Sequence, residues 1–147
     1  MIAYMTSQKR WTSHGKVWGT RALILSVFIA NLSAAIPFIL QPERFAAGFE
    51  MSGIAGEVSV RGMGILFLMW NATFPLVILR PGRYRVLFSV MLAQQIIGLL
   101  GETIMWVSLP AGHATLQATG MRFILFDGVG LALLISAFLL SRKDHEG

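Results

Sequence analysis

The chain of 147 residues contains no cysteine. Without cysteine there is no disulfide bond, thiolate-bound metal, iron–sulfur cluster or thiol nucleophile. Histidine is also scarce, and none of His14, His113 and His145 lies inside an apolar run. We therefore predict no metal site, and no haem or pigment held by a histidine within a membrane.

Charged residues are also few: they make up 13% of the chain, whereas 55% of the residues are hydrophobic. The mean hydropathy of +0.67 is typical of an integral membrane protein and not of a soluble domain. The sequence pI near 10.5 comes from bases that lie beside apolar runs, as they do at the ends of membrane spans. We therefore expect the lipid bilayer as partner and exclude nucleic acid.

Common catalytic motifs are missing as well. The chain has no Gly-x-Ser-x-Gly elbow, no His-Glu-x-x-His zinc motif and no Gly-x-x-x-x-Gly-Lys phosphate loop. The sequence Gly62-Met63-Gly64 lacks the strand-turn-helix context of a nucleotide-binding loop. These absences favour a protein that is not an enzyme, and they leave enzymatic activity open.

Four apolar runs are long enough to cross a bilayer as helices, at about residues 22–40, 58–79, 86–109 and 121–140. A basic N-terminal arm, residues 1–21, precedes them, and a charged tail, residues 141–147, follows. The short loops predict one all-α domain, a four-helix bundle with up-down-up-down topology.

Local patterns refine this bundle. Pro42, with Phe45 and Phe49 on one side, predicts a short outer interfacial helix between the first two spans, with the two rings as surface anchors. The first run also fits a cleaved secretory signal with small residues near Ser33, but we expect an uncleaved span. Its small-residue stripe, which would let helices approach closely, consists of Ala22, Ser26, Ala30 and Ala34.

Positive residues divide unequally between the two ends of this bundle. Nine of the twelve bases fall on one side, namely Lys9, Arg10, Lys16, Arg21, Arg80, Arg83, Arg85, Arg142 and Lys143. Because Lys and Arg favour the cytoplasmic side, we predict that both termini are cytoplasmic. The predicted location is the inner (cytoplasmic) membrane.

Polar residues inside the spans form the candidate site. Gln95, Gly98 and Glu102 share one face of the third span. The topology places Glu102 about 10 Å, and Asp127 about 9 Å, from the outer ends of their helices, at the depth of Arg61. We therefore predict a paired cluster in the outer half of the bundle, because charges within spans rarely stay unpaired. The candidate residues are Arg61, Glu102, Asp127, Glu57, Asn71, Gln95 and Asn31.

Three interpretations of this cluster stay open. It is a structural network between helices, a pocket for a small molecule or a lipid headgroup, or part of a proton or ion pathway. Asn71 is expected to bond a neighbouring helix, and Pro75 to mark a kink. Glycines beside the cluster, which leave space for packing or for a ligand, are Gly64, Gly98 and Gly130.

The sequence Arg61-Gly62-Met63-Gly64 opens the second span, after a surface segment with Pro42 and Phe45, and the third and fourth spans are polar and Gly-rich. In these features the chain resembles the DoxX-like family of small bacterial membrane proteins. The resemblance implies a four-helix membrane fold and a link to quinone-dependent oxidoreductase systems or to stress-related membrane complexes. It also implies an acid shortly after Arg61, but residues 65–69 are all apolar, so Glu102 and Asp127 would take its place.

Three functions follow from these observations. The first is an accessory subunit or a binder of small ligands or lipids. The second is a component of a quinone-linked membrane oxidoreductase, or an enzyme acting on a lipophilic substrate. The third is a proton-coupled transporter. No cofactor is predicted, a quinone or a lipid is the candidate ligand, and a homo-oligomer or a larger membrane complex is the candidate assembly.

Overall fold

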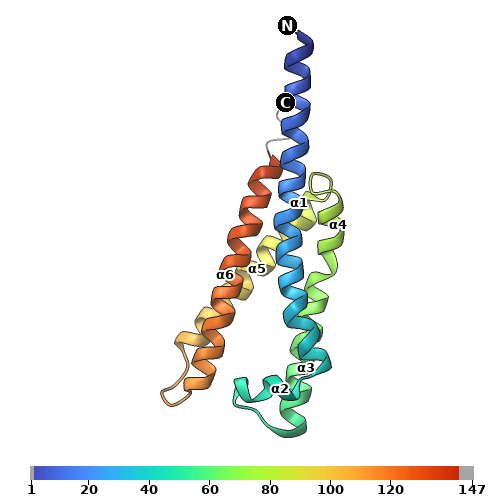
Figure 1. Cartoon of the computed structure of the whole chain (residues 1–147). Coiled ribbons are helices and arrows are strands. Elements are labelled where there is room, and N and C mark those ends of the chain that lie inside the picture. The colour runs from blue at the N-terminus through green and yellow to red at the C-terminus, as the bar shows by residue number, and fades with distance from the viewer. Residues whose placement is uncertain (1, 143–147) are drawn as a thin grey trace.

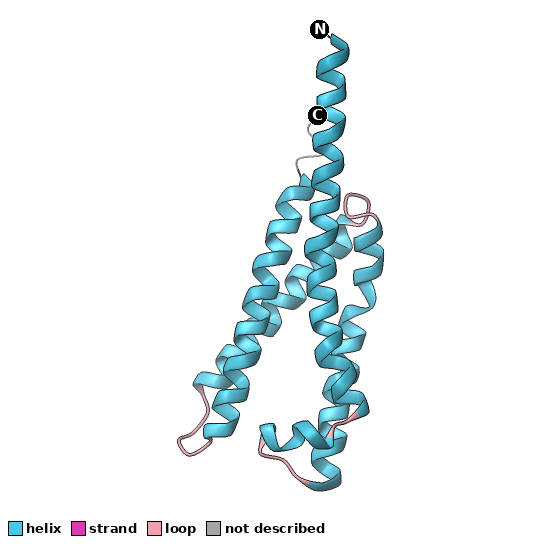
Figure 2. Cartoon of the chain, in the orientation of Figure 1, coloured by secondary structure: helices cyan, strands magenta, loops and turns pink. Residues whose placement is uncertain are grey.

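The structure is a computed structural model that describes the backbone of residues 2–142 and the side chains of residues 15–141. All regular elements in this part of the chain are helical (Figures 1 and 2). In chain order they are α1 (Ile2–Leu40), α2 (Glu43–Ala46), the 3-10 turn η1 (Ala47–Phe49), α3 (Gly53–Trp70), the 3-10 turn η2 (Asn71–Thr73), α4 (Phe74–Leu79), α5 (Arg85–Val107) and α6 (Ala114–Arg142).

Four stretches are long and apolar enough to cross a membrane: Gly15–Leu40, Gly53–Leu79, Arg85–Val107 and Ala114–Ser141. Large apolar side chains on them point outward, and Ile29, Ile97 and Leu125 are 58%, 65% and 62% exposed. Such surfaces need apolar surroundings, as a bilayer provides. The coarse prediction of an all-helical, multi-pass membrane protein is confirmed.

The boundaries differ from the prediction at the ends. Helix α1 begins at Ile2, so the predicted arm is the first part of the same helix, and α6 begins at Ala114 before the predicted fourth span. Apolarity marks only the part of a helix that lies in the bilayer core, and polar turns can extend it at either end. Residues 143–147 of the predicted tail lie outside the described residues.

The second span is interrupted where the prediction places a kink. Pro75 has no N–H to donate to the carbonyl of Asn71, and its ring crowds that carbonyl. The chain responds with the 3-10 turn η2, in which the Phe74 N–H donates to the Asn71 carbonyl. The break turns the Asn71 side chain into the bundle, where it is 3% exposed.

The long helices pack around α1. It lies against α3 and α6, and α5 lies against α6 (Figure 1). The half of the bundle nearer the 80–84 turn holds an apolar core formed by Ile24, Val27, Phe74, Val77, Phe88, Met91, Leu134 and Ala137.

The first two residues of the predicted small-residue stripe lie away from the packing face of α1, whereas Ala30 and Ala34 are half-buried. Ala22 and Ser26 are exposed, and the Ser26 hydroxyl donates back to the Ala22 carbonyl over 2.8 Å. The buried face instead carries larger side chains such as Ile24 and Val27. Burial of these larger side chains stabilises the bundle more than close approach of alanines would.

The connector between the first two spans closes the other end of the bundle. The Phe45 and Phe49 rings lie 4.8 and 6.0 Å from the Phe38 ring, and Phe49 lies 6.0 Å from Phe123 of α6. The two rings therefore pack inward against other aromatic rings, which differs from the predicted surface anchors. Rings at these distances gain from mutual packing in addition to burial.

Glu50 fastens this connector to the start of α6. Its Oε2 lies 2.5 Å from His113 Nδ1, and its Oε1 accepts a hydrogen bond of 3.3 Å from the Leu116 N–H. The carboxylate thus caps the first turn of α6, where free N–H groups favour an anion. The backbone of Glu50 has φ of 53°, which is costly for a residue with a Cβ, and these bonds hold it there.

At acid pH, protonation of Glu50 should weaken its hydrogen bond to the first turn of α6. Its hydrogen bond with His113, followed by the N–H of Leu116, lowers the pKa of Glu50 below the ordinary value of 4.5, although partial burial opposes this. A lowered pKa in the folded state means that the stability contributed by the ionised Glu50 is present above pH 4.5 and is lost as the pH falls through the lower value.

The Leu116 amide chemical shift, followed by NMR in micelles, should titrate with a midpoint below 4.5. Glu50→Gln should abolish that titration and Glu43→Gln should keep it. A midpoint above 4.5 would contradict the capping role.

Candidate functional site

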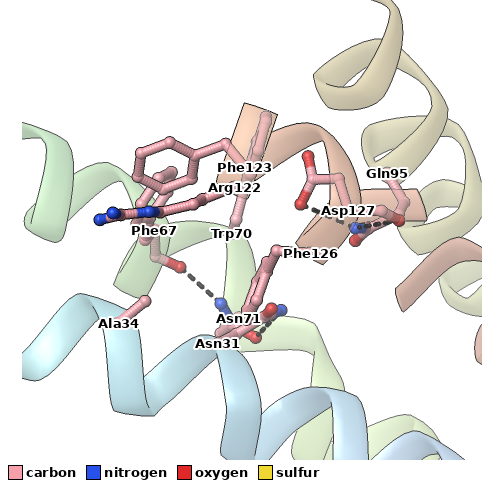
Figure 3. A pocket seen from close by; sticks show the side chains of 10 residues that line it. All are labelled: Asn31, Ala34, Phe67, Trp70, Asn71, Gln95, Arg122, Phe123, Phe126 and Asp127. Carbon is pink, nitrogen blue, oxygen red and sulfur yellow. Dashed lines mark hydrogen bonds between the residues drawn. The ribbon is translucent and has the colours of Figure 1, made fainter. Parts of the chain in front are cut away.

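The polar stripe on α5 faces α6. Gln95 Nε2 donates to Asp127 Oδ1 over 3.0 Å and to the Asp127 backbone carbonyl over 3.2 Å (Figure 3). Residues three and four apart share a helical face, so Gly98 and Glu102 turn toward the same side as Gln95. This arrangement agrees with the predicted stripe.

Gly98 permits the close approach of this stripe to its neighbours. A Cβ atom at Gly98 would lie 2.8 Å from Asp127 Oδ2 and 3.5 Å from Trp70 Cη2. The missing side chain therefore lets an indole from α3 and a carboxyl from α6 meet α5 at one point. Gly130 does the same for Gln95, whose Nε2 would lie 3.0 Å from a Cβ at that position.

The two asparagines form a second polar pair. Asn31 Nδ2 on α1 donates to Asn71 Oδ1 over 2.9 Å, and Asn71 Nδ2 donates to the Phe67 carbonyl over 2.7 Å (Figure 3). Asn71 thus joins the interruption of the second span to α1, as expected for a polar group that needs a partner inside a bundle.

Arg61 does not pair with Glu102 or Asp127. The predicted pairing of Arg61 with these two acids is therefore wrong. The Arg61 Nε donates to the carbonyl of Ile39 over 3.2 Å, and within the described residues no ion pair joins it to Glu102 or Asp127. Ile39 lies in the last turn of α1, where carbonyls lack helical partners and attract arginine. Glu57 likewise makes no hydrogen bond or ion pair in the described part of the chain.

A mostly apolar cavity of about 150 Å³, with several polar side chains at its wall, lies between α1, α3, α5 and α6. Asn31, Asn71, Gln95 and Asp127 all line it (Figure 3). Arg122 also lines it, although its side chain extends away from Asp127. The polar candidates other than Arg61, Glu57 and Glu102 are therefore brought together around one space.

A second, lateral cavity of about 370 Å³ lies between α3, α5 and the start of α6. Its lining is apolar apart from Glu102 and includes Met63, Leu66, Met69, Met105 and Phe49. Leu66, Met69 and Met105 are 60%, 65% and 57% exposed, so the cavity opens at the apolar flank of the bundle. Glu102 Oε2 is buried there without a hydrogen-bond partner.

An aromatic wall, formed by Phe67, Trp70 and Phe123, lines both cavities. The carboxyl groups of Glu102 and Asp127, which line different cavities, lie close enough to interact electrostatically. The site thus has two chambers with a shared aromatic boundary: the first, called the polar chamber here for the polar side chains at its wall, and the lateral cavity, whose one ionisable lining residue is Glu102. A buried polar oxygen without a partner is a costly feature that a ligand can relieve.

Sequence reasoning missed several of these residues. In the sequence Arg122 is only a base near the end of a span, and nothing distinguishes Trp70 from a packing residue. Helical spacing offered a signal, because Phe123 and Asp127 lie four residues apart and so share a face. The methionines gave no such signal, since an apolar residue in a span faces lipid, core or cavity without any change in sequence pattern.

No protein-family model matches this chain, and no curated protein or solved structure matches it either. The resemblance to the DoxX-like family therefore stays a prediction from the sequence.

Proposed function

We propose that this protein binds a lipophilic small molecule that carries one polar group and enters the lateral cavity from the bilayer. The observation that carries the proposal is Glu102, whose buried Oε2 has no partner, at the wall of an otherwise apolar space of about 370 Å³. Binding sites of this kind combine apolar lining with a few polar groups and have volumes of about 300–1,000 Å³.

The chemistry of the polar group follows from the carboxyl. An ionised carboxyl accepts a hydrogen bond from a hydroxyl or an amine, and a protonated one donates to a carbonyl. A hydroquinone and a quinone both lie within this range. The methionines suit such a ligand, because flexible thioether side chains adapt to irregular apolar shapes.

The proposed topology is a bundle whose successive spans alternate in direction, with both termini in the cytoplasm. Thr20, the 80–83 turn and Ser141 line one cavity at one end, whereas Glu50 and His113 meet at the other. Both contacts support alternation. Bases gather at the first end, which supports placing that end on the cytoplasmic side of the inner membrane.

Removal of the Glu102 carboxyl should weaken binding. With purified protein in nanodiscs, a benzoquinone with a decyl tail and its hydroquinone would serve as probes, and the dissociation constant would be measured by equilibrium binding. Glu102→Leu should raise it at least about tenfold, the effect of losing one hydrogen bond to a charged or buried polar group. Glu102→Gln should have a smaller effect because an amide still bonds.

Glu57→Gln is the matched control, since this carboxyl lines neither cavity. If wild type and Glu102→Leu bind the quinone probes with equal affinity, the proposal is wrong. Native mass spectrometry of the protein, purified in mild detergent, would show any lipophilic molecule from the membrane that remains bound to it.

The proximity of Glu102 to Asp127 favours a second candidate, a component of a quinone-linked oxidoreductase. Reduction of a quinone to a hydroquinone takes up two electrons, which a redox partner protein would supply, and two protons, which carboxyls beside the quinone can supply as general acids. Quinone turnover that is unchanged in Glu102→Gln and in Asp127→Asn would dispose of this role. The apolar core counts against the third candidate, a transporter, because it separates the polar chamber from the basic end of the bundle.

A further inference from the structure

A separate cavity of about 260 Å³ lies at the end of the bundle opposite the connector. The first half of α1, the turn between α4 and α5 and the end of α6 all contribute to it, through Thr20, Arg80 and Ser141. Leu79 and Arg85 are the adjoining ends of two spans, so the cavity lies at the level where a bilayer has its headgroups.

Three arginines line this cavity, namely Arg21, Arg80 and Arg83. None of them forms an ion pair with an acid in the described part of the chain. Arg21 is held in place, because its Nη2 donates to the Leu79 carbonyl over 2.6 Å and its guanidinium lies 5.5 Å from the Trp18 ring. The cavity therefore has positive charge, fixed in position at Arg21, and no counter-charge among the described residues.

Two residues that line this cavity, Thr20 and Arg21, each carry a buried polar atom without a partner. Thr20 is 1% exposed, and neither its Oγ1 nor the Arg21 Nε has a hydrogen-bond partner. Both groups can donate, and a buried donor without an acceptor is destabilising. Ser141, by contrast, donates to the Phe138 carbonyl over 2.7 Å. The donors of Thr20 and Arg21 therefore each lack an acceptor within the described part of the chain.

We propose that this cavity binds the phosphate group of an anionic phosphate ester, as carried by a membrane lipid. A phosphate has several acceptor oxygens for the donors of Thr20 and Arg21, and guanidinium groups match its geometry through paired hydrogen bonds. Its negative charge is favoured beside Arg80 and Arg83. This site lies apart from the lateral cavity, and its existence does not depend on the proposed function.

The test uses the full chain in mild detergent and measures binding of dioctanoyl phosphatidylglycerol by native mass spectrometry. Replacing Arg80 and Arg83 together by glutamine should weaken binding about 25-fold, at about fivefold for each base. Thr20→Val, which keeps every charge, should weaken it about tenfold, as expected for a lost hydrogen bond to a charged group. Arg44→Gln, an exposed base on α2, should have no effect.

Thr20→Val is the decisive variant, because diffuse attraction of a basic surface to lipid does not depend on a hydroxyl. If Thr20→Val binds as wild type does, or if Arg44→Gln weakens binding as much as the joint replacement of Arg80 and Arg83, the proposal is overturned. Arg83→Lys keeps the positive charge but lacks the planar guanidinium group that forms paired hydrogen bonds, so it should bind the lipid less well than wild type.

Two further probes distinguish the source of the phosphate. Glycerol 3-phosphate and inorganic phosphate carry the charge without acyl chains. If they bind as tightly as the lipid and depend equally on Thr20, the ligand is a free phosphate or a soluble phosphate ester. If binding needs the acyl chains, the ligand is a lipid headgroup. Absence of Thr20-dependent binding for all three probes would refute the site.

Discussion

Replacement of Gly64 by alanine is expected to lower the free energy of unfolding by about 1–3 kcal/mol, the usual cost of forcing an extra carbon into a packed interface. A Cβ at this position would lie 2.8 Å from Ile39 Cγ1, 2.8 Å from Phe38 Cβ and 2.9 Å from the Ala35 carbonyl oxygen. Backbone and Cβ atoms cannot rotate away, so α1 and α3 would have to separate.

Gly62 on the same helix is the matched control. No atom lies within 4 Å of a Cβ built there, so alanine should stabilise α3 by about 0.5–1 kcal/mol through its better helix propensity. The two variants should thus shift stability in opposite directions, as measured by SDS titration in mixed micelles. Equal shifts for both would show that α1 and α3 do not approach as closely as Gly64 implies.

Replacement of Gly98 by leucine should disturb both chambers of the candidate site. Its Cβ would meet Asp127 Oδ2 at 2.8 Å and the Trp70 ring at 3.5 Å. Asp127 can retreat only by weakening its 3.0 Å bond from Gln95, and Trp70 only by reshaping the aromatic wall. We expect a loss of about 1–3 kcal/mol in stability and, for the quinone probe, a dissociation constant raised at least about tenfold.

The control for Gly98 is Gly101→Leu, since nothing lies within 4 Å of a Cβ at Gly101 and the residue is exposed. It adds the same side chain to the same helix at an exposed position where a Cβ meets no neighbouring atom, and it should leave binding unchanged. Loss of stability without loss of binding in Gly98→Leu would confirm the packing and would separate it from the proposed ligand site.

Several features of the site could be predicted because they depend on helical spacing. The face shared by Gln95, Gly98 and Glu102 follows from the period of the helix. That Asn71 bonds a neighbouring helix follows from the cost of an unpaired amide inside a bundle, although the identity of its partner, Asn31, does not. The interruption before Pro75 follows from its missing N–H. Each of these needs only local geometry and a polar group that must be satisfied.

The position of Arg61 could not be predicted in this way. Depth in the bilayer placed it near Glu102 and Asp127, but depth does not determine the rotation of a helix about its axis. That rotation is set where Gly64 meets α1, and it carries Arg61 to the carbonyl of Ile39. The same limit explains Arg122, which lines the polar chamber although the sequence shows only a base near the end of a span.

The four apolar helices, their interruption at Pro75 and the gathering of bases at one end can all be derived from the amino-acid order, because hydropathy, ring chemistry and charge are properties of short segments. The division of polar and apolar groups between the chambers depends on how the helices pack in three dimensions. The close contacts at Gly64 and Gly98 set how the helices turn toward one another, and those turns leave Glu102 in an apolar cavity and Thr20 beside arginines. Packing between distant segments, which no local pattern encodes, is the physical reason.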